Sequence, residues 1–163
     1  MKLTKRAIDS FQFKKGKAIS SFPGLWCMWD VLPLLNPSNI VSLGEGSTPC
    51  VQLANLGKKL GINDLWAKLE YLNPTGSFKD RGTTVMLSVA KELGLTRLVE
   101  DSSGNAGSSF ASYASRGQLD ASVFIPDQAP HAKRLQISFY GADVHPTSGT
   151  RDDVAKAAVS YAK

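Results

Sequence analysis

The chain has 163 residues, of which 42% are hydrophobic and 20% charged, and its formal net charge at pH 7 is +5. This length and composition are typical of one globular domain, or of one and a part, with a useful core. The basic residues gather near the start without interleaved aromatic residues, which argues against nucleic-acid binding but is compatible with small anions such as phosphates. The sequence shows no apolar run of membrane-spanning length and no hydrophobic region of a secretion signal, so we expect no membrane insertion and a cytoplasmic location.

Few residues could hold a metal or form a disulfide. Cys27 and Cys50 are too few and too far apart for a disulfide framework. His131 and His145 have no cysteine or carboxylate at ligand spacing, so we expect no structural metal and place both histidines at the surface.

The first part of the chain is irregular. Residues 1–21 are basic and polar and are predicted to form a tail or short arm, whereas the aromatic segment 22–35 is broken by prolines and should pack against another element. The segment ANLGKKLG, residues 54–61, fits a short helix closed by a glycine. Residues 65–71 alternate apolar and polar, which predicts a strand.

The stretch NPTGSFKDRG, Asn73–Gly82, is a turn that runs into a helix, with Ser77 as a good N-cap. A helical stripe is expected on the face that carries Val85, Met86, Val89, Ala90 and Leu93. Lys79 falls in the first turn, where the partial positive charge of the helix N-terminus disfavours an ammonium group and favours a neutral, nucleophilic amine suited to Schiff-base chemistry. A solvated lysine at a frayed helix start explains the spacing at least as well.

From here on, strands and helices alternate. Helices are expected over residues 78–93, from about 105, over 130–139 and from about 150, with strands over 97–101, 121–126 and 142–146 between them. This alternation predicts an α/β fold: an open parallel sheet of βαβ units with right-handed crossovers.

A second polar stretch, DSSGNAGSS, Asp101–Ser109, lies at a strand–helix junction. Gly104 allows a tight turn and close backbone approach, and the first N–H groups of the helix near Asn105 offer a site for a carboxylate or phosphate. Ser102 and Ser103 add hydroxyl donors. An ordinary helix cap with a small-residue packing face is equally compatible. The glycine spacing matches neither a dinucleotide fingerprint nor a Walker motif, which disfavours nucleotide binding.

Three ordered segments, LGEGSTPCVQL (residues 43–53), NPTGSFKDRG and SSGNAG, resemble the threonine-synthase-like, pyridoxal-phosphate-dependent enzymes of fold type II. The resemblance implies that Lys79 holds pyridoxal 5'-phosphate as a Schiff base and acts as acid and base, with Phe78 lining the cofactor pocket. It implies that Asn105 donates a hydrogen bond to the cofactor's ring hydroxyl oxygen. The loop expected to bind the substrate's carboxylate consists of Ser102, Ser103, Gly104, Asn105 and Ala106.

Within this family the motif SFKDRG favours a threonine synthase, which converts O-phosphohomoserine into threonine and phosphate. Ala106 weakens that assignment, because synthases that handle a phosphorylated substrate often carry threonine there. The alternatives are a β-elimination or β-replacement enzyme of the threonine/serine dehydratase or cysteine synthase type, or a non-catalytic α/β binding module.

The family's members are longer, so the resemblance predicts an N-terminal piece, inactive by itself and a weak cofactor binder. Residues 1–71 would comprise an arm with a strand and helix that pack on the absent second domain, and residues 72–163 the small domain. The expected partners are an amino-acid substrate, the missing C-terminal half and, in the complete protein, a second copy. Leu65, Trp66, Leu69 and the region Trp26–Trp29 would then lack packing partners.

Overall fold

Three parallel strands form the central sheet of the computed structural model, which describes residues 21–163. They are β3 (Arg97–Glu100), β4 (Asp120–Pro126) and β5 (Asp143–Thr147), in the spatial order β3-β4-β5. Val99 of β3 pairs with Ser122, and Val123 of β4 pairs with Val144. The predicted α/β fold with an open parallel sheet is confirmed. Of the tail expected over residues 1–21, residues 1–20 lie outside the described residues.

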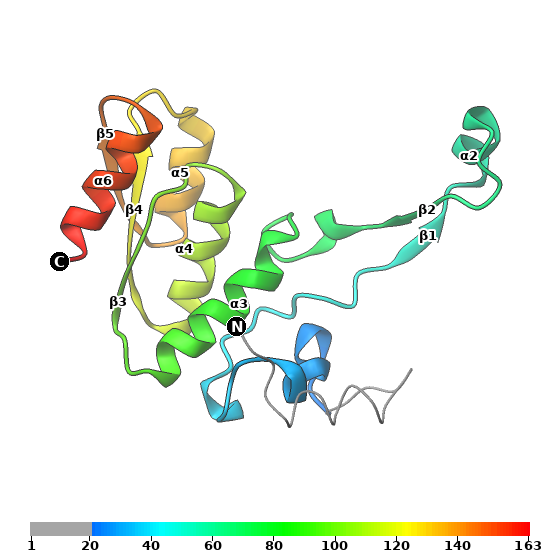
Figure 1. The fold of residues 1–163 in the computed structure, drawn as a ribbon, viewed down its shortest axis with the longest axis horizontal. Coiled ribbons are helices and arrows are strands. Elements are labelled where there is room, and N and C mark those ends of the chain that lie inside the picture. Colours follow the sequence, from blue (N-terminus) through cyan, green and yellow to red (C-terminus); the bar gives the residue numbers. More distant parts are fainter. Residues whose placement is uncertain (1–20) are drawn as a thin grey trace.

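Helices cover both faces of this sheet (Figure 1). Helices α4 (Asn105–Gly117) and α5 (His131–Phe139) lie on one face, and α6 (Arg151–Tyr161) lies on the other. The sequence of β4 explains the layers, because successive strand side chains point to opposite faces. Val123 and Ile125 join the core beneath α4 and α5, whereas Phe124 packs with Val154 and Ala158 of α6.

Helix α3 (Lys79–Glu92) packs against α4, but of the predicted stripe it buries Ala90 alone and half-buries Val85 and Val89. Met86 and Leu93 are 47% and 70% exposed, while Leu87 is fully buried together with two hydroxyl residues, Thr84 and Ser88. The reason is that the hydroxyls pair with another part of the chain. Thr84 Oγ1 donates to the Val41 carbonyl at 2.6 Å, and Val41 N donates to Ser88 Oγ at 2.8 Å. Hydrogen bonds of this kind allow polar side chains to occupy a core face.

The segment before this sheet packs on α3 through two 3₁₀ helices, η1 (Gly24–Val31) and η2 (Pro37–Asn39). Trp26 is 1% exposed, and its Nε1 donates to Thr84 Oγ1 at 2.8 Å and to Glu45 Oε1 at 3.2 Å. The aromatic segment is therefore packed as predicted. The expectation that Trp26 would lack partners is wrong, because α3 and Glu45 supply them.

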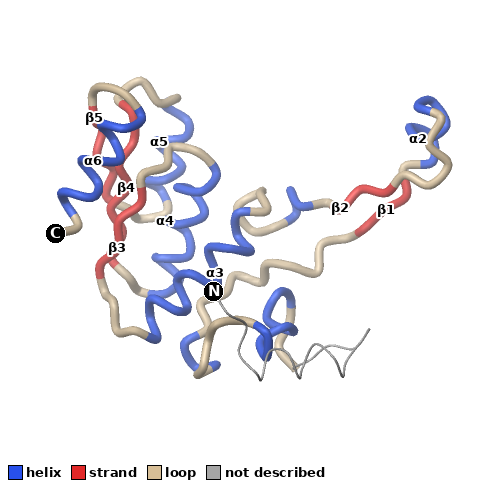
Figure 2. The backbone as a smooth tube through the Cα atoms, viewed as in Figure 1, coloured by secondary structure: helices blue, strands red, loops and turns tan. Residues whose placement is uncertain are grey.

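A thin arm projects from this body (Figures 1 and 2). It consists of the antiparallel pair β1 (Cys50–Gln52) and β2 (Trp66–Lys68) with helix α2 (Ala54–Leu60) at its tip. The predicted helix is confirmed, and Gly61 ends it in a left-handed conformation. Large apolar side chains are exposed along the arm: Val51, Leu56, Leu60, Ile62 and Trp66.

The strand predicted over residues 65–71 is shorter than expected. It ends at Lys68, and a 3₁₀ turn, η3 (Glu70–Leu72), follows. The turn is stabilised by side-chain bonds of Glu70 that alternation of polar and apolar residues does not reveal.

Residues 21–163 contain no helix whose length and apolar character would allow it to cross a bilayer. In the same residues no group of three potential metal ligands lies together, and both cysteines are free. His131 is exposed as expected, whereas His145 on β5 is half-buried. Its ring stacks on Phe124 with centroids 4.6 Å apart.

Candidate active site

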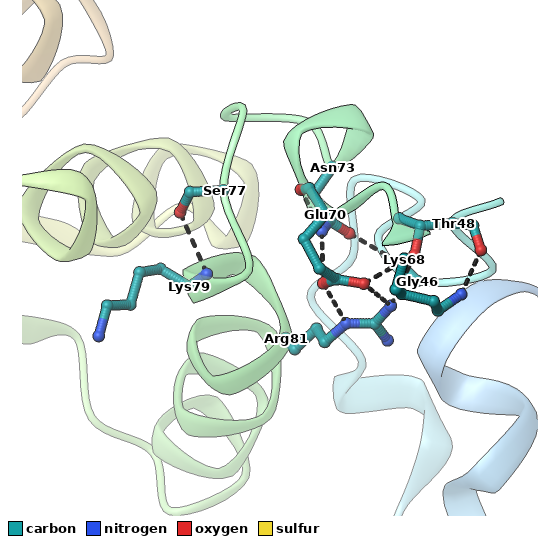
Figure 3. Close-up of polar contacts among 8 residues, drawn as sticks. All are labelled: Gly46, Thr48, Lys68, Glu70, Asn73, Ser77, Lys79 and Arg81. Carbon is teal, nitrogen blue, oxygen red and sulfur yellow. Dashed lines mark hydrogen bonds and ion pairs between the residues drawn. The ribbon is translucent and has the colours of Figure 1, made fainter. Parts of the chain in front are cut away.

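Lys79 is the first residue of α3 and extends its side chain into solvent (Figure 3). Helix α3 begins one residue later than predicted, with Phe78 rather than Ser77 at the N-cap position. The Ser77 hydroxyl still accepts a hydrogen bond from Lys79 N at 3.1 Å. The Phe78 ring lies 4.7 Å from Lys79 Nζ, and within residues 21–163 the amine makes no hydrogen bond or ion pair. A primary amine is thus held beside an aromatic ring and remains accessible.

The turn before Lys79 is fixed by the next residue, Asp80. This carboxylate is completely buried and accepts hydrogen bonds from Thr75 N at 2.8 Å, Thr75 Oγ1 at 2.5 Å and Ser109 Oγ at 2.6 Å. Buried charges are tolerated where hydrogen bonds satisfy them. Asp80 therefore shapes the lysine turn and joins it to the helix that carries the second motif.

The second motif lies where β3 ends and α4 begins. Asn105 is the first residue of α4 and is exposed, and Gly104 occupies the N-cap position. No side chain of the described residues caps this terminus. Its first N–H groups remain available to an anion, as the sequence predicted.

The loop and α4 come into close contact at Gly107. A Cβ on Gly107 would come within 1.8 Å of the Ser102 carbonyl oxygen, whereas one on Gly104 would meet Ser102 Oγ at an ordinary 3.9 Å. Gly104 also has a negative φ of −100° that other residues adopt. The loop closes over α4 because residue 107 has no side chain, and the role expected of Gly104 beside a ligand stays a prediction.

The two motifs lie at the same end of the sheet. Ser109 lies one turn after Asn105, and its hydroxyl donates a hydrogen bond to Asp80. Asp80 directly follows Lys79 in the chain. Burial raises the pKa of Glu100, at the carboxyl end of β3, and the charge of Lys79 is close enough to oppose that shift. Ligands of open α/β sheets bind outside the carboxyl ends of the strands. The geometry therefore brings the amine, the asparagine and the uncapped helix terminus to the edge at which open α/β sheets bind ligands.

A polar cluster that the sequence did not reveal lies behind Lys79 (Figure 3). Arg81 and Glu70 form a two-point ion pair, with Nε to Oε2 at 2.7 Å and Nη2 to Oε1 at 2.8 Å. Thr48 Oγ1 donates to Glu70 Oε1 at 2.7 Å. Arg81 and these donors lower the pKa of Glu70 from 4.5 to about 2. The pair ties the base of the arm to the first turn of α3.

Further bonds complete this cluster. Asn73 Oδ1 accepts from Gly46 N at 3.0 Å, Asn73 Nδ2 donates to Glu70 Oε2 at 3.0 Å, and Lys68 Nζ donates to the Thr48 carbonyl. The side chain of Lys79 points away from the cluster. Within the lysine motif, Asn73 and Arg81 thus bond to the base of the arm, whereas the amine of Lys79 points in the other direction.

An ion pair also supports the asparagine loop from the opposite face of the sheet. Arg151 Nη1, at the start of α6, lies 2.8 Å from Asp101 Oδ2. Asp101 directly precedes the loop, so this pair fixes where the loop leaves β3.

Residues 41–163 match a sequence model of the family described as "Pyridoxal-phosphate dependent enzyme". The threonine synthases of Methanocaldococcus jannaschii and of a Bacillus species are 42% and 41% identical to this chain over 141 and 127 residues. These alignments cover 86% and 77% of this chain but 35% and 36% of the relatives. The chain thus spans about a third of the length of these relatives.

Solved structures show the same likeness. The processed form of threonine deaminase isoform 2 from Solanum lycopersicum superposes with a TM-score of 0.65 at 26% identity, covering 71% of this chain and 32% of that one. A pyridoxal 5'-phosphate-dependent aspartate racemase superposes with a TM-score of 0.64 at 28% identity, covering 71% of this chain and 36% of that one.

Proposed function

The chain belongs to the pyridoxal-phosphate-dependent enzyme family, and on that premise we propose that it is the lysine-bearing part of a threonine-synthase-like lyase. One observation carries the proposal. The amine of Lys79 makes no hydrogen bond with any described residue, and it lies at the same sheet edge as Asn105 and the uncapped terminus of α4.

The residues at this edge fit the cofactor's chemistry. A primary amine suits its aldehyde, a side-chain amide suits its ring oxygen, and an uncapped helix terminus suits a carboxylate on the substrate. The bound cofactor supplies an electron-withdrawing ring that stabilises negative charge on the carbon atoms of an amino acid. The residues of the chain bind it, orient the substrate and move protons.

We assign each role to one residue of this edge. Lys79 Nζ would hold the cofactor covalently and, as a free amine, would move a proton to or from the substrate carbons. Phe78 would line the pocket beside that amine, and Asn105 would donate from Nδ2 to the ring oxygen. The carboxylate of the substrate is received by the loop and first turn formed by Ser102, Ser103, Gly104, Asn105 and Ala106.

For the substrate we propose O-phosphohomoserine, converted into threonine and phosphate. The identity to curated threonine synthases supports this choice. The second candidate is a deaminase-type β-elimination on threonine or serine. Ala106, which lacks a hydroxyl, and the similarity to threonine deaminase favour that reading.

We also propose that the chain acts with the remainder of a longer protein, in a cytoplasmic homodimer, and is inactive alone. The exposed apolar residues of the arm support such a partner, because a two-stranded hairpin is marginally stable by itself.

Cofactor attachment tests the proposal. The chain is incubated with pyridoxal 5'-phosphate, reduced with borohydride and digested, and the modified residue is mapped by mass spectrometry. We expect modification at Lys79 above all, and little at Lys91, near the other end of the same helix. Labelling spread evenly over the lysines, or unchanged in Lys79→Ala, would overturn the assignment.

The assay that identifies the substrate requires a longer protein. A chimera in which the missing part of the Methanocaldococcus jannaschii relative follows Lys163 should release phosphate from O-phosphohomoserine, and its Lys79→Ala variant should not. The 163-residue chain alone should release none. Ammonia release from threonine without phosphate release from O-phosphohomoserine would support the deaminase-type candidate instead.

A further inference from the structure

We propose that Lys133, on α5, is a positioning residue that fixes the side-chain amide of Asn105 with its NH₂ group turned toward the bound ligand. The inference deepens the proposed function and rests on it, because the ligand is the cofactor's ring oxygen. It assigns to α5 a part in a site that the sequence placed on α3 and α4 alone.

The contact itself determines the orientation. Lys133 Nζ donates to Asn105 Oδ1 at 2.9 Å. An ammonium group has only donors, so the atom that faces it must be the amide's oxygen and never its NH₂ group. The two N–H donors of Asn105 are thereby directed away from α5 and offered to an acceptor.

A second residue of α5 holds Lys133 in place. Gln136 Oε1 accepts from Lys133 Nζ at 3.4 Å and from Ser108 Oγ at 3.0 Å. Ser108 belongs to the first turns of α4, one turn after Gly104, whose carbonyl also accepts from Ser108 Oγ at 3.4 Å. The completely buried Ile137 fixes the rotation of α5 beside them. The lysine is therefore part of a network between two packed helices.

The charge of Lys133 also strengthens the donor that it orients. A hydrogen bond from an ammonium group polarises the amide, and donors in such a chain strengthen one another. Asn105 therefore becomes a better donor to an oxygen that carries negative charge, as the ring oxygen of the cofactor does when deprotonated.

The chain provides a matched control in the next residue. Arg134 donates to the Asp127 carbonyl at 3.4 Å and has no hydrogen bond to Asn105. Lys133→Gln and Arg134→Gln each remove one positive charge from α5, but only the first removes the donor-only ammonium group that faces Asn105 and replaces it with a shorter amide that can also accept. Lys133→Arg keeps a donor and its charge.

A first measurement needs no cofactor. The side-chain NH₂ resonances of Asn105, assigned by their loss in Asn105→Asp, are compared among the variants by NMR. We expect them to shift in Lys133→Gln, to stay in Arg134→Gln and to be largely retained in Lys133→Arg. Urea unfolding checks that all variants fold. Unchanged Asn105 resonances in Lys133→Gln would overturn the inference.

A second measurement uses pyridoxal 5'-phosphate itself. We expect Lys133→Gln to weaken its binding about 2–10-fold, the range for one hydrogen bond, and to reduce the visible absorption band in favour of the near-ultraviolet band. Arg134→Gln should bind and absorb as the wild type does. Equal binding and spectra in all three proteins, with Lys79 still labelled, would overturn the role of Lys133 and leave the proposed function standing. Failure to label Lys79 in the wild type would overturn the proposed function, while the NMR comparison would still decide whether Lys133 orients Asn105.

Discussion

The Ser109 hydroxyl donates a 2.6 Å hydrogen bond to the Asp80 carboxylate, and both groups are completely buried. This contact joins the first turn of α3 to α4, so it sets how far apart the two motif-bearing helix ends lie. The separation of Lys79 and Asn105 thus depends on a pair of residues that would touch no ligand.

Replacement of Asp80 by alanine should destabilise the chain by about 1–3 kcal/mol, because the Thr75 and Ser109 donors would be buried without an acceptor. Ser109→Ala should cost less, since Thr75 would still satisfy Asp80. Urea unfolding measures both changes. Asp152→Ala, at an exposed carboxylate in the first turn of α6, is the control and should change stability by less than about 1 kcal/mol.

Replacing either of two glycines with alanine should change the stability of the chain, in opposite directions for the two positions. Gly107→Ala forces a Cβ to within 1.8 Å of the Ser102 carbonyl oxygen and should destabilise by about 1–3 kcal/mol while displacing the asparagine loop. Gly82→Ala, in an exposed position of α3 with no described atom within 4 Å of the new Cβ, should stabilise by about 1 kcal/mol. Thermal unfolding compares the two variants. The same change in stability in both would contradict the loop geometry.

Low pH should weaken the Glu70–Arg81 ion pair that connects the arm to α3. The pKa of Glu70 is lowered from 4.5 to about 2, chiefly by Arg81. The stabilisation that the ionised Glu70 carboxylate provides is therefore complete above its unfolded-state pKa. This stabilisation is lost as the pH falls toward the folded-state pKa. Glu70→Gln should make unfolding by urea less dependent on pH between about pH 5 and about pH 2.

Arg81→Met provides the reciprocal variant, since it removes the cation rather than the carboxylate. If the stability of Glu70→Gln in urea fell with pH as steeply as that of the wild type, the Glu70–Arg81 pair would not control the pH dependence.

The arm should drive self-association of the chain. Trp66 is 52% exposed on a two-stranded hairpin, and exposed apolar surface of this kind promotes contacts between molecules. Sedimentation velocity should show concentration-dependent association that Trp66→Glu weakens. Leu93→Glu, which changes a 70% exposed apolar residue at the C-cap of α3, should not weaken it. A compact monomer at all concentrations would contradict this expectation.

The alternation of apolar runs, turns and small residues was sufficient to predict the order of elements from α3 onward. These are local patterns, and the positions of Lys79 and Asn105 at helix starts follow from them. The buried face of α3 could not be predicted in this way, because the buried hydroxyls of Thr84 and Ser88 bond to Trp26 and Val41, far away in sequence.

The supports of the site were missed for a related reason. Lys133 and Arg81 look like ordinary surface cations in the sequence, and their partners, Asn105 and Glu70, lie 28 and 11 residues away. The steric requirement at Gly107 could not be predicted from the sequence, because a glycine inside a helix carries no local signal of a close contact. Only the folded backbone shows that this position leaves no room for a Cβ.

The position of α6 has a consequence for how the sheet can grow. Helices α4 and α5 carry the chain from β3 to β4 to β5 along one face, whereas α6 turns back along the other. A right-handed crossover through α6 leads away from β5 and toward the outer side of β3. A strand added in that way would lie next to β3, and strand order would reverse where the loop that begins at Ser102 leaves the sheet. The position of one helix would thus turn the asparagine loop into one wall of a crevice between two diverging halves of the sheet.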